Sequence, residues 1–278
     1  MAISFAFDGD DVVWTQRFDR PAVYLDTFAI RAIAESDEQS ARFAQGLKAC
    51  NGTWLLAAVS MGEFARFADP RHAERAEWLV AQVVPHVYLF LSDPAEARAR
   101  RGDTDPAKRS LPPSDRRNMD YFSRKWAQTQ SFAETFQGMF QVIHENRGRM
   151  TETLEEVTSK LVASITQCRQ METYRSKAKA SRPDDGRTRQ QIISGELLRE
   201  LVLDPNASIT ANDAVDLMHA IDAVDYCDLV LLDKAWERRV NALHQRIADT
   251  GIAMPIARCL SMRNGGIDEL LEAIERWP

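Results

Sequence analysis

The sequence predicts an α/β fold in which a parallel β-sheet is flanked by helices and interrupted by a large α-helical insertion. Three observations lead to this fold class. Short apolar runs alternate with helical patterns near both ends of the chain, and two of these runs end abruptly in an acid, Asp26 and Asp233. Between them, apolar positions recur in steps of three and four, the spacing of a helix face. We therefore divide the chain into an α/β part, residues 1–92 and 190–278, and an insertion, residues 93–189.

The first part of the chain contains three strand-like apolar runs, over residues 22–25, 54–59 and 87–91. Phe43 and Leu47 share a helix face between the first two runs, and residues 73–84 form the next helix. At the beginning of the chain, residues 3–13 are expected to form a polar hairpin or a lead-in strand.

The insertion contains a continuous row of apolar or small residues at helical spacing, which we call the seam. Its members are Met119, Phe122, Trp126, Thr129, Ala133, Phe136, Phe140 and Ile143. We expect a long helical hairpin, with a break between its two helices near residues 146–148 and with Thr151 capping the second helix. Because the seam keeps its phase across Gly148, one continuous helix is the alternative. The aromatic members of the seam are expected to form core.

Basic residues gather at both ends of the insertion. On one side they are Arg98, Arg100, Arg101, Lys108, Arg109, Arg116, Arg117, Arg124 and Lys125, and on the other Arg169, Arg175, Lys177, Lys179, Arg182, Arg187 and Arg189. They form either solvated helix surface or a rim that binds phosphate groups.

The last part of the chain returns to alternating elements. Helices are expected over residues 192–203, 214–224, 235–248 and 268–277, and strands over residues 229–232 and 255–260.

Composition places the chain among ordinary soluble globular proteins. The net charge of -6 argues against a general nucleic-acid coat protein, although carboxylates that bind metal ions contribute to that total. Cys50, Cys168, Cys227 and Cys259 are scattered without a CxxC pair, so we expect reduced thiols rather than a zinc site or a disulfide scaffold. No signal peptide and no membrane span are predicted, and we expect a cytoplasmic protein without a membrane partner.

Four acids fall where a parallel sheet would bring them together. Asp26 and Asp233 each end an apolar run, Glu63 follows the second run closely, and Asp216 lies in the first turns of a helix that Thr210 can cap. The carboxyl ends of parallel strands meet at one edge of a sheet, and ligands bind at that edge. Carboxylates are ligands for Mg²⁺ and Mn²⁺, and a cluster of them is costly without a cation. The sequence therefore predicts a Mg²⁺ or Mn²⁺ site built from these four acids.

Two segments resemble the PIN-domain nucleases. They are Val23-Tyr24-Leu25-Asp26-Thr27-Phe28 and the stretch from Asp216-Leu-Met-His219 to Tyr226-Cys-Asp228-Leu-Val-Leu-Leu-Asp233-Lys234. The resemblance covers roughly residues 20–92 and 190–278. In that family an aspartate ends the first strand, a glutamate lies on an early helix, a third acid opens a late helix and a fourth follows the next strand. Asp26, Glu63, Asp216 and Asp233 match this pattern in order.

The resemblance implies a hydrolase that cuts nucleic acid, most often RNA, with Mg²⁺ or Mn²⁺ held by these four catalytic acids. It also implies a role such as that of a bacterial toxin or an antiviral defence effector, with an inhibitor protein as a partner and a homodimer as the assembly. The insertion would then select or clamp the substrate, or mediate dimerisation.

Two other interpretations stay open at this point. Residues 3–13 resemble the opening motif of haloacid-dehalogenase phosphohydrolases, in which Asp8 would be the nucleophile and Asp10 the general acid–base. Alternatively, the chain is a catalytically inactive PIN-like module that binds RNA or protein. His219 follows Asp216 by three residues, but we interpret it as a packed core histidine outside the site.

Overall fold

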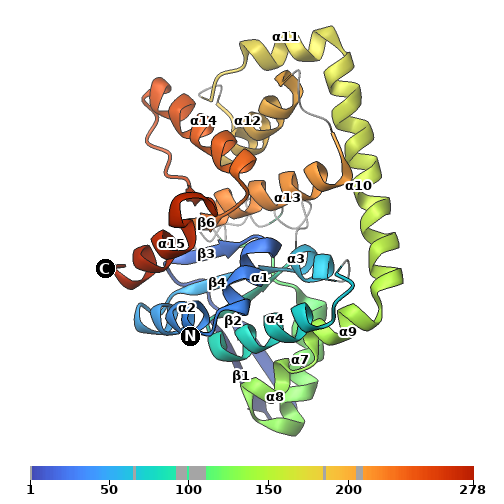
Figure 1. Ribbon diagram of the computed structural model, residues 1–278, viewed down its shortest axis with the longest axis vertical. Coiled ribbons are helices and arrows are strands. Elements are labelled where there is room, and N and C mark those ends of the chain that lie inside the picture. The colour runs from blue at the N-terminus through green and yellow to red at the C-terminus, as the bar shows by residue number, and fades with distance from the viewer. Residues whose placement is uncertain (1, 65–66, 92–98, 100–110, 184–185, 205–208) are drawn as a thin grey trace.

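A parallel sheet lies at the centre of the protein (Figure 1). The computed structural model describes residues 2–64, 67–91, 99, 111–183, 186–204 and 209–278. Within these ranges the main sheet has five strands in the order β5-β4-β3-β6-β7, and every neighbouring pair is parallel. The strands are β3 (Ala22–Leu25), β4 (Thr53–Ala57), β5 (Val87–Phe90), β6 (Leu229–Leu231) and β7 (Arg258–Leu260). The predicted α/β fold class is confirmed.

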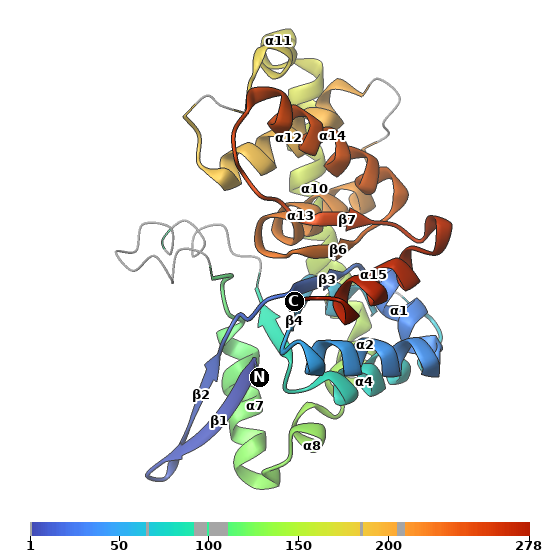
Figure 2. The same ribbon diagram turned by 90° about the vertical axis from the view of Figure 1, so that its left-hand side faces the viewer.

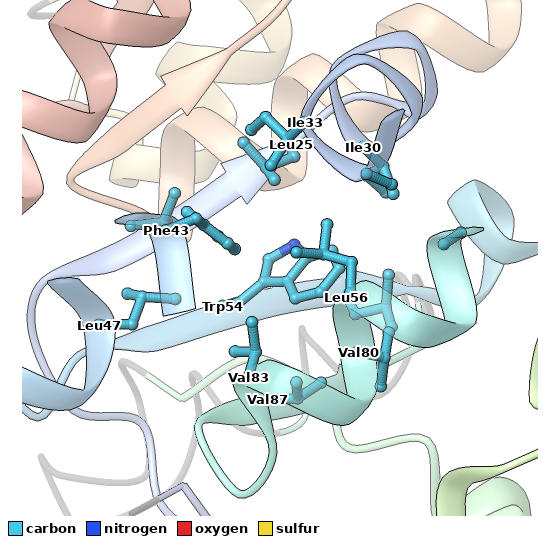
Figure 3. Close-up of a cluster of buried hydrophobic side chains, with 14 of the residues drawn as sticks. Leu25, Ile30, Ile33, Phe43, Leu47, Trp54, Leu56, Val80, Val83 and Val87 are labelled. Carbon is cyan, nitrogen blue, oxygen red and sulfur yellow. The ribbon is translucent and has the colours of Figure 1, made fainter. Parts of the chain in front are cut away.

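The strands are short apolar runs because helices cover both faces of the sheet. Side chains alternate between the faces, so Val23 and Leu25 belong to one buried cluster and Ala22 and Tyr24 to the other. The first face packs against α1 (Thr27–Glu35), α2 (Asp37–Ala49), α4 (Arg71–Val83) and α15 (Gly266–Glu275). Figure 3 shows part of this core, where Trp54 lies among Leu25, Phe43 and Val83.

Three helices cover the other face. They are α12 (Arg189–Leu203), α13 (Ala211–Tyr226) and α14 (Lys234–Thr250). The order of the strands makes β3 the switch point of the sheet, because the chain proceeds from β3 through β4 to β5 on one side and later from β6 to β7 on the other. In open α/β sheets the crevice at such a point is the usual ligand site.

The beginning of the chain forms a separate antiparallel hairpin, as predicted. Its strands are β1 (Ile3–Asp8) and β2 (Asp11–Gln16), and Asp8 pairs with Asp11 beside the turn. Gly9 has a φ of 62° in that turn, a conformation that glycine adopts without strain. The hairpin packs on the insertion, where the rings of Phe5 and Trp126 are 5.6 Å apart.

The insertion differs from the predicted helical hairpin. Its described elements are α7 (Arg116–Thr129), α8 (Phe132–Phe136), α9 (Met139–Glu145), α10 (Arg147–Gln170) and α11 (Glu172–Ala180). A single helix over residues 119–143 is wrong, because Gln130 (φ 49°) and Gly138 (φ 82°) take left-handed conformations that interrupt it. Asn146 precedes α10, so Thr151 lies inside that helix instead of capping it, and one continuous helix through this region is also wrong.

The insertion also does not fold back on itself. α7, α8 and α9 pack near β2 and α4, whereas α10 runs past α3 (Ala58–Glu63) and α13 towards α11 and α12 (Figures 1 and 2). The aromatic seam is core as predicted, because Phe122, Phe136 and Phe140 are buried. The helices of the insertion therefore contact the rest of the protein in two places, at β2 and α4 and at α12 and α13.

The remaining elements match the predicted ones within a few residues, and β7 is shorter than the expected strand over residues 255–260. All four cysteines are free thiols. Among the described residues, the helices include none that is both long and apolar enough to cross a membrane.

Candidate metal centre

Asp26 and Asp233 lie side by side in the fold because each follows one of two paired strands. The backbone N–H of Asp26 donates to the carbonyl of Leu231, 3.1 Å away, at the carboxyl ends of β3 and β6. Asp26 caps α1 by accepting a hydrogen bond from the N–H of Thr27 (2.7 Å), and Asp233 caps α14 by accepting one from the N–H of Trp236 (2.8 Å). Each carboxylate thus has a fixed place at the switch point of the sheet.

Glu63 reaches the same place from the end of α3, the short helix that follows β4 directly. The hydroxyl of Thr27 donates a 2.5 Å hydrogen bond to Oε2 of Glu63. Tyr24 and Ser60 share a buried 2.9 Å hydrogen bond, which fixes the start of α3 against β3. The side chain of Glu63 is 14% exposed, so it lies largely inside the protein.

His219 belongs to this site, which corrects its assignment to the satisfied core. Its Nδ1 lies 3.4 Å from Oδ1 of Asp26 and 3.8 Å from Oε2 of Glu63. Ligand atoms of these three residues all lie within 4.8 Å of one another. The side chain of His219 is 3% exposed, and neither ring nitrogen has a hydrogen-bond partner in the described part of the chain. A buried polar group without a partner is costly, so the imidazole needs an explanation beyond packing.

Asp216 lies one turn before His219 on α13 and is also close to the other acids. Burial, and then the charge of Asp26, raise the pKa of Asp216 to about 7, with smaller contributions from Glu63 and Asp233 and an opposing one from His219. Asp216 and Asp233 are outside the tight group of Asp26, Glu63 and His219. Asp216 nevertheless interacts electrostatically with Asp26, Glu63 and Asp233.

The neighbouring carboxylates favour the protonated form of His219 in the absence of a metal ion. Burial by itself lowers the pKa of His219, but Asp26, Glu63 and Asp216 outweigh this effect and raise that pKa to about 9. The protonated imidazole therefore offsets part of the negative charge of the carboxylates.

The donor set fits a divalent cation. Carboxylate oxygens and an imidazole nitrogen bind such ions at about 2.0–2.2 Å, so atoms spaced as in Asp26, Glu63 and His219 can approach one ion with small side-chain adjustments. Imidazole suits Fe²⁺ and Zn²⁺, carboxylates suit Mg²⁺ and Mn²⁺, and the mixed set favours a transition metal such as Mn²⁺ over Mg²⁺. The sequence offered one signal for His219, since residues three apart share a helix face.

The other acids named from the sequence lie elsewhere. Asp8 and Asp10 are exposed at the turn of the β1–β2 hairpin, which is not part of the parallel sheet. The phosphohydrolase motif requires the nucleophile at the carboxyl edge of such a sheet, and Asp8 is not there. A further acid of α13, Asp213, accepts hydrogen bonds from the N–H and hydroxyl of Thr210 and is thus part of the cap of this helix.

Within the described part of the chain, the basic residues of α7 and those of α11 do not form one rim. α7 and α11 lie at opposite ends of the molecule (Figure 1), so their basic side chains cannot meet. Arg98, Arg100, Arg101, Lys108 and Arg109 are outside the described residues.

A search against protein-family models, curated proteins and solved structures found no match to this chain.

Proposed function

We propose that the protein is a metal-dependent nuclease that hydrolyses phosphodiester bonds, most directly an endoribonuclease. One observation carries this proposal. Two carboxylates and a buried imidazole without a hydrogen-bond partner lie within ligand distance of one another at the switch point of a parallel sheet, and two further acids are coupled to them. Protons on His219 and Asp216 offset only part of the negative charge of such a cluster, and a bound cation would offset the rest.

Asp26, Glu63 and His219 would hold the ion, which is Mn²⁺ or Mg²⁺ in this proposal. When bound, it would polarise the phosphodiester and lower the pKa of a water molecule. Asp216 and Asp233 lie beside this set and would hold either a second ion or the attacking water.

The surrounding residues would keep the ligands in place. Asp26 is held by the first N–H of α1, and Glu63 by the hydroxyl of Thr27. Because side chains that are already oriented lose little freedom on binding, these bonds favour a single arrangement of the ligands. His219, on α13, would connect the cation to the helix that also carries Asp216.

RNA is the proposed substrate because the ordered acids resemble those of PIN-domain nucleases. A role as a toxin or antiviral defence effector in the cytoplasm, control by an inhibitor protein and assembly as a homodimer belong to the same proposal.

Cleavage of a panel of single-stranded and structured RNA and DNA tests the function. Wild type is compared with Asp26→Asn, Asp233→Asn and His219→Asn in Mn²⁺, in Mg²⁺ and in EDTA. We expect metal-dependent cutting that is lost in Asp26→Asn and Asp233→Asn. Asp8→Asn is the matched control, since this exposed acid lies on the hairpin and its substitution should leave cutting unchanged.

A module that binds nucleic acid without cutting it is the second candidate. It predicts a folded wild type that binds RNA but leaves every substrate intact with either metal. A phosphatase activity lost in Asp8→Asn would instead support the phosphohydrolase interpretation.

A further inference from the structure

A cavity of about 570 Å³ lies at the edge of the sheet opposite the metal centre. Leu229 and Arg258, the first residues of β6 and β7, line it, and α15 forms another wall (Figure 2). We call it the α15 cavity. It is open to solvent, because the side chains of Arg258 and Arg276 on its wall are 55% and 79% exposed. It shares no residue with the metal centre, which lies where β3 and β6 end.

Four arginines line the α15 cavity. They are Arg20, Arg189, Arg258 and Arg276. Nη1 of Arg20 donates a 2.9 Å hydrogen bond to the carbonyl of Tyr226, and Nη2 of Arg189 donates a 2.6 Å hydrogen bond to that of Asp225. Both carbonyls belong to the last turn of α13, where the carbonyls have no partner within the helix. The end of α13 therefore fixes two of the four guanidinium groups.

Each of these arginines keeps donors that no described residue uses. A guanidinium carries five N–H donors. Within the described part of the chain, the side-chain bonds of Arg20, Arg258 and Arg276 come from one terminal nitrogen each. Arg189 uses Nη2 and Nε, and its Nη1 makes no bond there. The remaining N–H groups are left for water or for a ligand in the cavity.

The carboxylates on the wall hold the arginines without using them up. Asp228 lies 2.9 Å from Arg20 and Glu272 lies 3.0 Å from Arg276, while Glu269 pairs with Arg258. The pairs on α15 are exposed, and exposed ion pairs contribute little to stability. A phosphate can therefore accept hydrogen bonds from Arg258 and Arg276 at little cost, even where a carboxylate has to give way.

The rest of the wall is apolar. It is formed by Leu229, Pro255, Ile256, Ala273 and Trp277. Trp277 is partly buried and packs on the core, so its ring has a supported position. Sites for small molecules typically have volumes of about 300–1,000 Å³ and combine apolar walls with a few polar groups. The α15 cavity thus suits a ligand that has both a flat ring and negative charge.

A second basic cavity does not have this combination. Its volume is about 640 Å³, and Lys179, Arg182 and Arg246 line it. No aromatic residue of the described chain is part of its wall. It provides a control for anion binding that depends on charge alone.

We propose that the α15 cavity binds a nucleoside phosphate. The base packs against Trp277 and the aliphatic wall, and the phosphate oxygens accept hydrogen bonds from Arg258 and Arg276, whose planar guanidinium groups match two oxygens of a phosphate. Arg20 and Arg189 add positive charge at the end of α13. The inference does not rest on the nuclease function proposed above, because the cavity and the metal centre have no residue in common.

Isothermal titration calorimetry in EDTA tests the proposal. The ligands are the 5′-monophosphates and 5′-diphosphates of the four ribonucleosides, with adenosine and pyrophosphate as probes of the ring and of the charge alone. We expect wild type to bind at least one nucleotide more tightly than either probe. Arg258→Gln and Arg276→Gln should each raise the Kd of that nucleotide about tenfold, because each removes hydrogen bonds to a charged group. Lys179→Gln, in the second cavity, is the matched control and should not change it.

Trp277→Leu separates the ring from the charge. It should weaken the binding of the nucleotide and leave that of pyrophosphate unchanged. Thermal unfolding without ligand checks the fold of each variant. Arg258→Gln and Arg276→Gln should unfold at the temperature of wild type, because their ion pairs are exposed. These two variants therefore test the phosphate contact even if Trp277→Leu is less stable.

Three results would overturn the proposal. They are a wild type that binds no nucleotide with a Kd below about 1 mM, pyrophosphate that binds as tightly as the best nucleotide, and nucleotide binding that Lys179→Gln or Asp26→Asn abolishes while Arg258→Gln retains it. The last result would place the nucleotide in the second cavity or at the metal centre. Wild type that binds a nucleotide in the α15 cavity but cuts no nucleic acid would support this inference and refute the nuclease, and the converse would refute only this inference.

Discussion

Nδ1 of His219 lies 3.4 Å from Oδ1 of Asp26, so the buried side of α13 meets the carboxyl end of the central strand β3. This contact joins the two segments of the chain on either side of the insertion. If the proposed metal ion binds here, His219 would supply a nitrogen ligand, which the acids by themselves do not provide. The arrangement leads to three predictions.

His219→Asn should weaken the binding of Mn²⁺ more than the binding of Mg²⁺. An imidazole nitrogen contributes more to a transition metal than to Mg²⁺, which prefers oxygen. We expect the Kd for Mn²⁺ to rise at least about tenfold, the scale seen when ligand support is lost at metal sites. Isothermal titration calorimetry with each metal measures both constants. Equal losses for the two metals would show that His219 contributes charge or packing and does not bind the ion.

The metal-free protein should lose thermal stability through Asp216 and His219 as the pH rises from about 4 to about 9. The pKa of Asp216 is raised to about 7, so the folded state binds its proton more tightly than the unfolded state does. The stabilisation of the folded state by protonated Asp216 is therefore complete below the ordinary pKa of an aspartate. This stabilisation is lost as the pH rises through 7. The pKa of His219 is raised to about 9, so its contribution is lost as the pH rises from its ordinary value through 9.

Differential scanning calorimetry in EDTA across this pH range measures the effect. In Asp216→Asn the part of the decline between about pH 4 and 7 should disappear, while the later part due to His219 stays. In the presence of a saturating divalent ion, thermal stability should instead rise with pH, because deprotonated side chains bind the ion more tightly than protonated ones. A metal-free melting temperature that is constant over the range would contradict the assigned protonation states.

Thr27→Val should lower metal affinity without changing the fold. Valine keeps the shape of threonine but removes the hydroxyl that donates to Glu63 over 2.5 Å. A hydrogen bond to a charged group contributes about 1.5–3 kcal/mol, so Glu63 would lose its fixed position. We expect Mn²⁺ to bind roughly tenfold more weakly, measured by the same calorimetry. Thr27→Ser retains the hydroxyl and should bind like wild type, whereas a loss of affinity in both variants would indicate a packing effect.

The parts of the fold predicted from sequence are those with strong local patterns. The runs at β3, β4, β5 and β6 are apolar because both faces of the sheet are covered, and the acids that follow them mark the carboxyl edge. Asp26 and Glu63 therefore come together in the structure, and Asp216 and Asp233 interact electrostatically with that group. His219 was missed because spacing shows that it shares a face with Asp216 but does not show what that face meets.

The helix breaks in the insertion were missed for a different reason. The seam through Phe122, Phe136 and Phe140 keeps its apolar spacing, and those residues are buried as expected. Gln130 nevertheless ends α7 in a left-handed conformation, although glutamine has no preference for it. Tertiary packing of three short helices on the main body overrides the local pattern. Gly138 was the one residue in the stretch whose type is typical of such a break.

Gln130→Gly should therefore stabilise the protein. The left-handed conformation costs a residue with a Cβ roughly 1–2 kcal/mol, and glycine removes this cost but loses some entropy on folding, which leaves a net gain of about 0.5–1 kcal/mol. Gly138→Ala is the matched control with the opposite sign. A Cβ at Gly138 meets nothing within 4 Å, so any loss of stability there comes from its φ of 82° and not from a clash. For a chain of this size the two variants should shift the melting temperature by about 2 °C in opposite directions. Shifts of the same sign would show that the breaks between α7, α8 and α9 are not held by these two backbone conformations, and that packing against α4 and β2 sets them by itself.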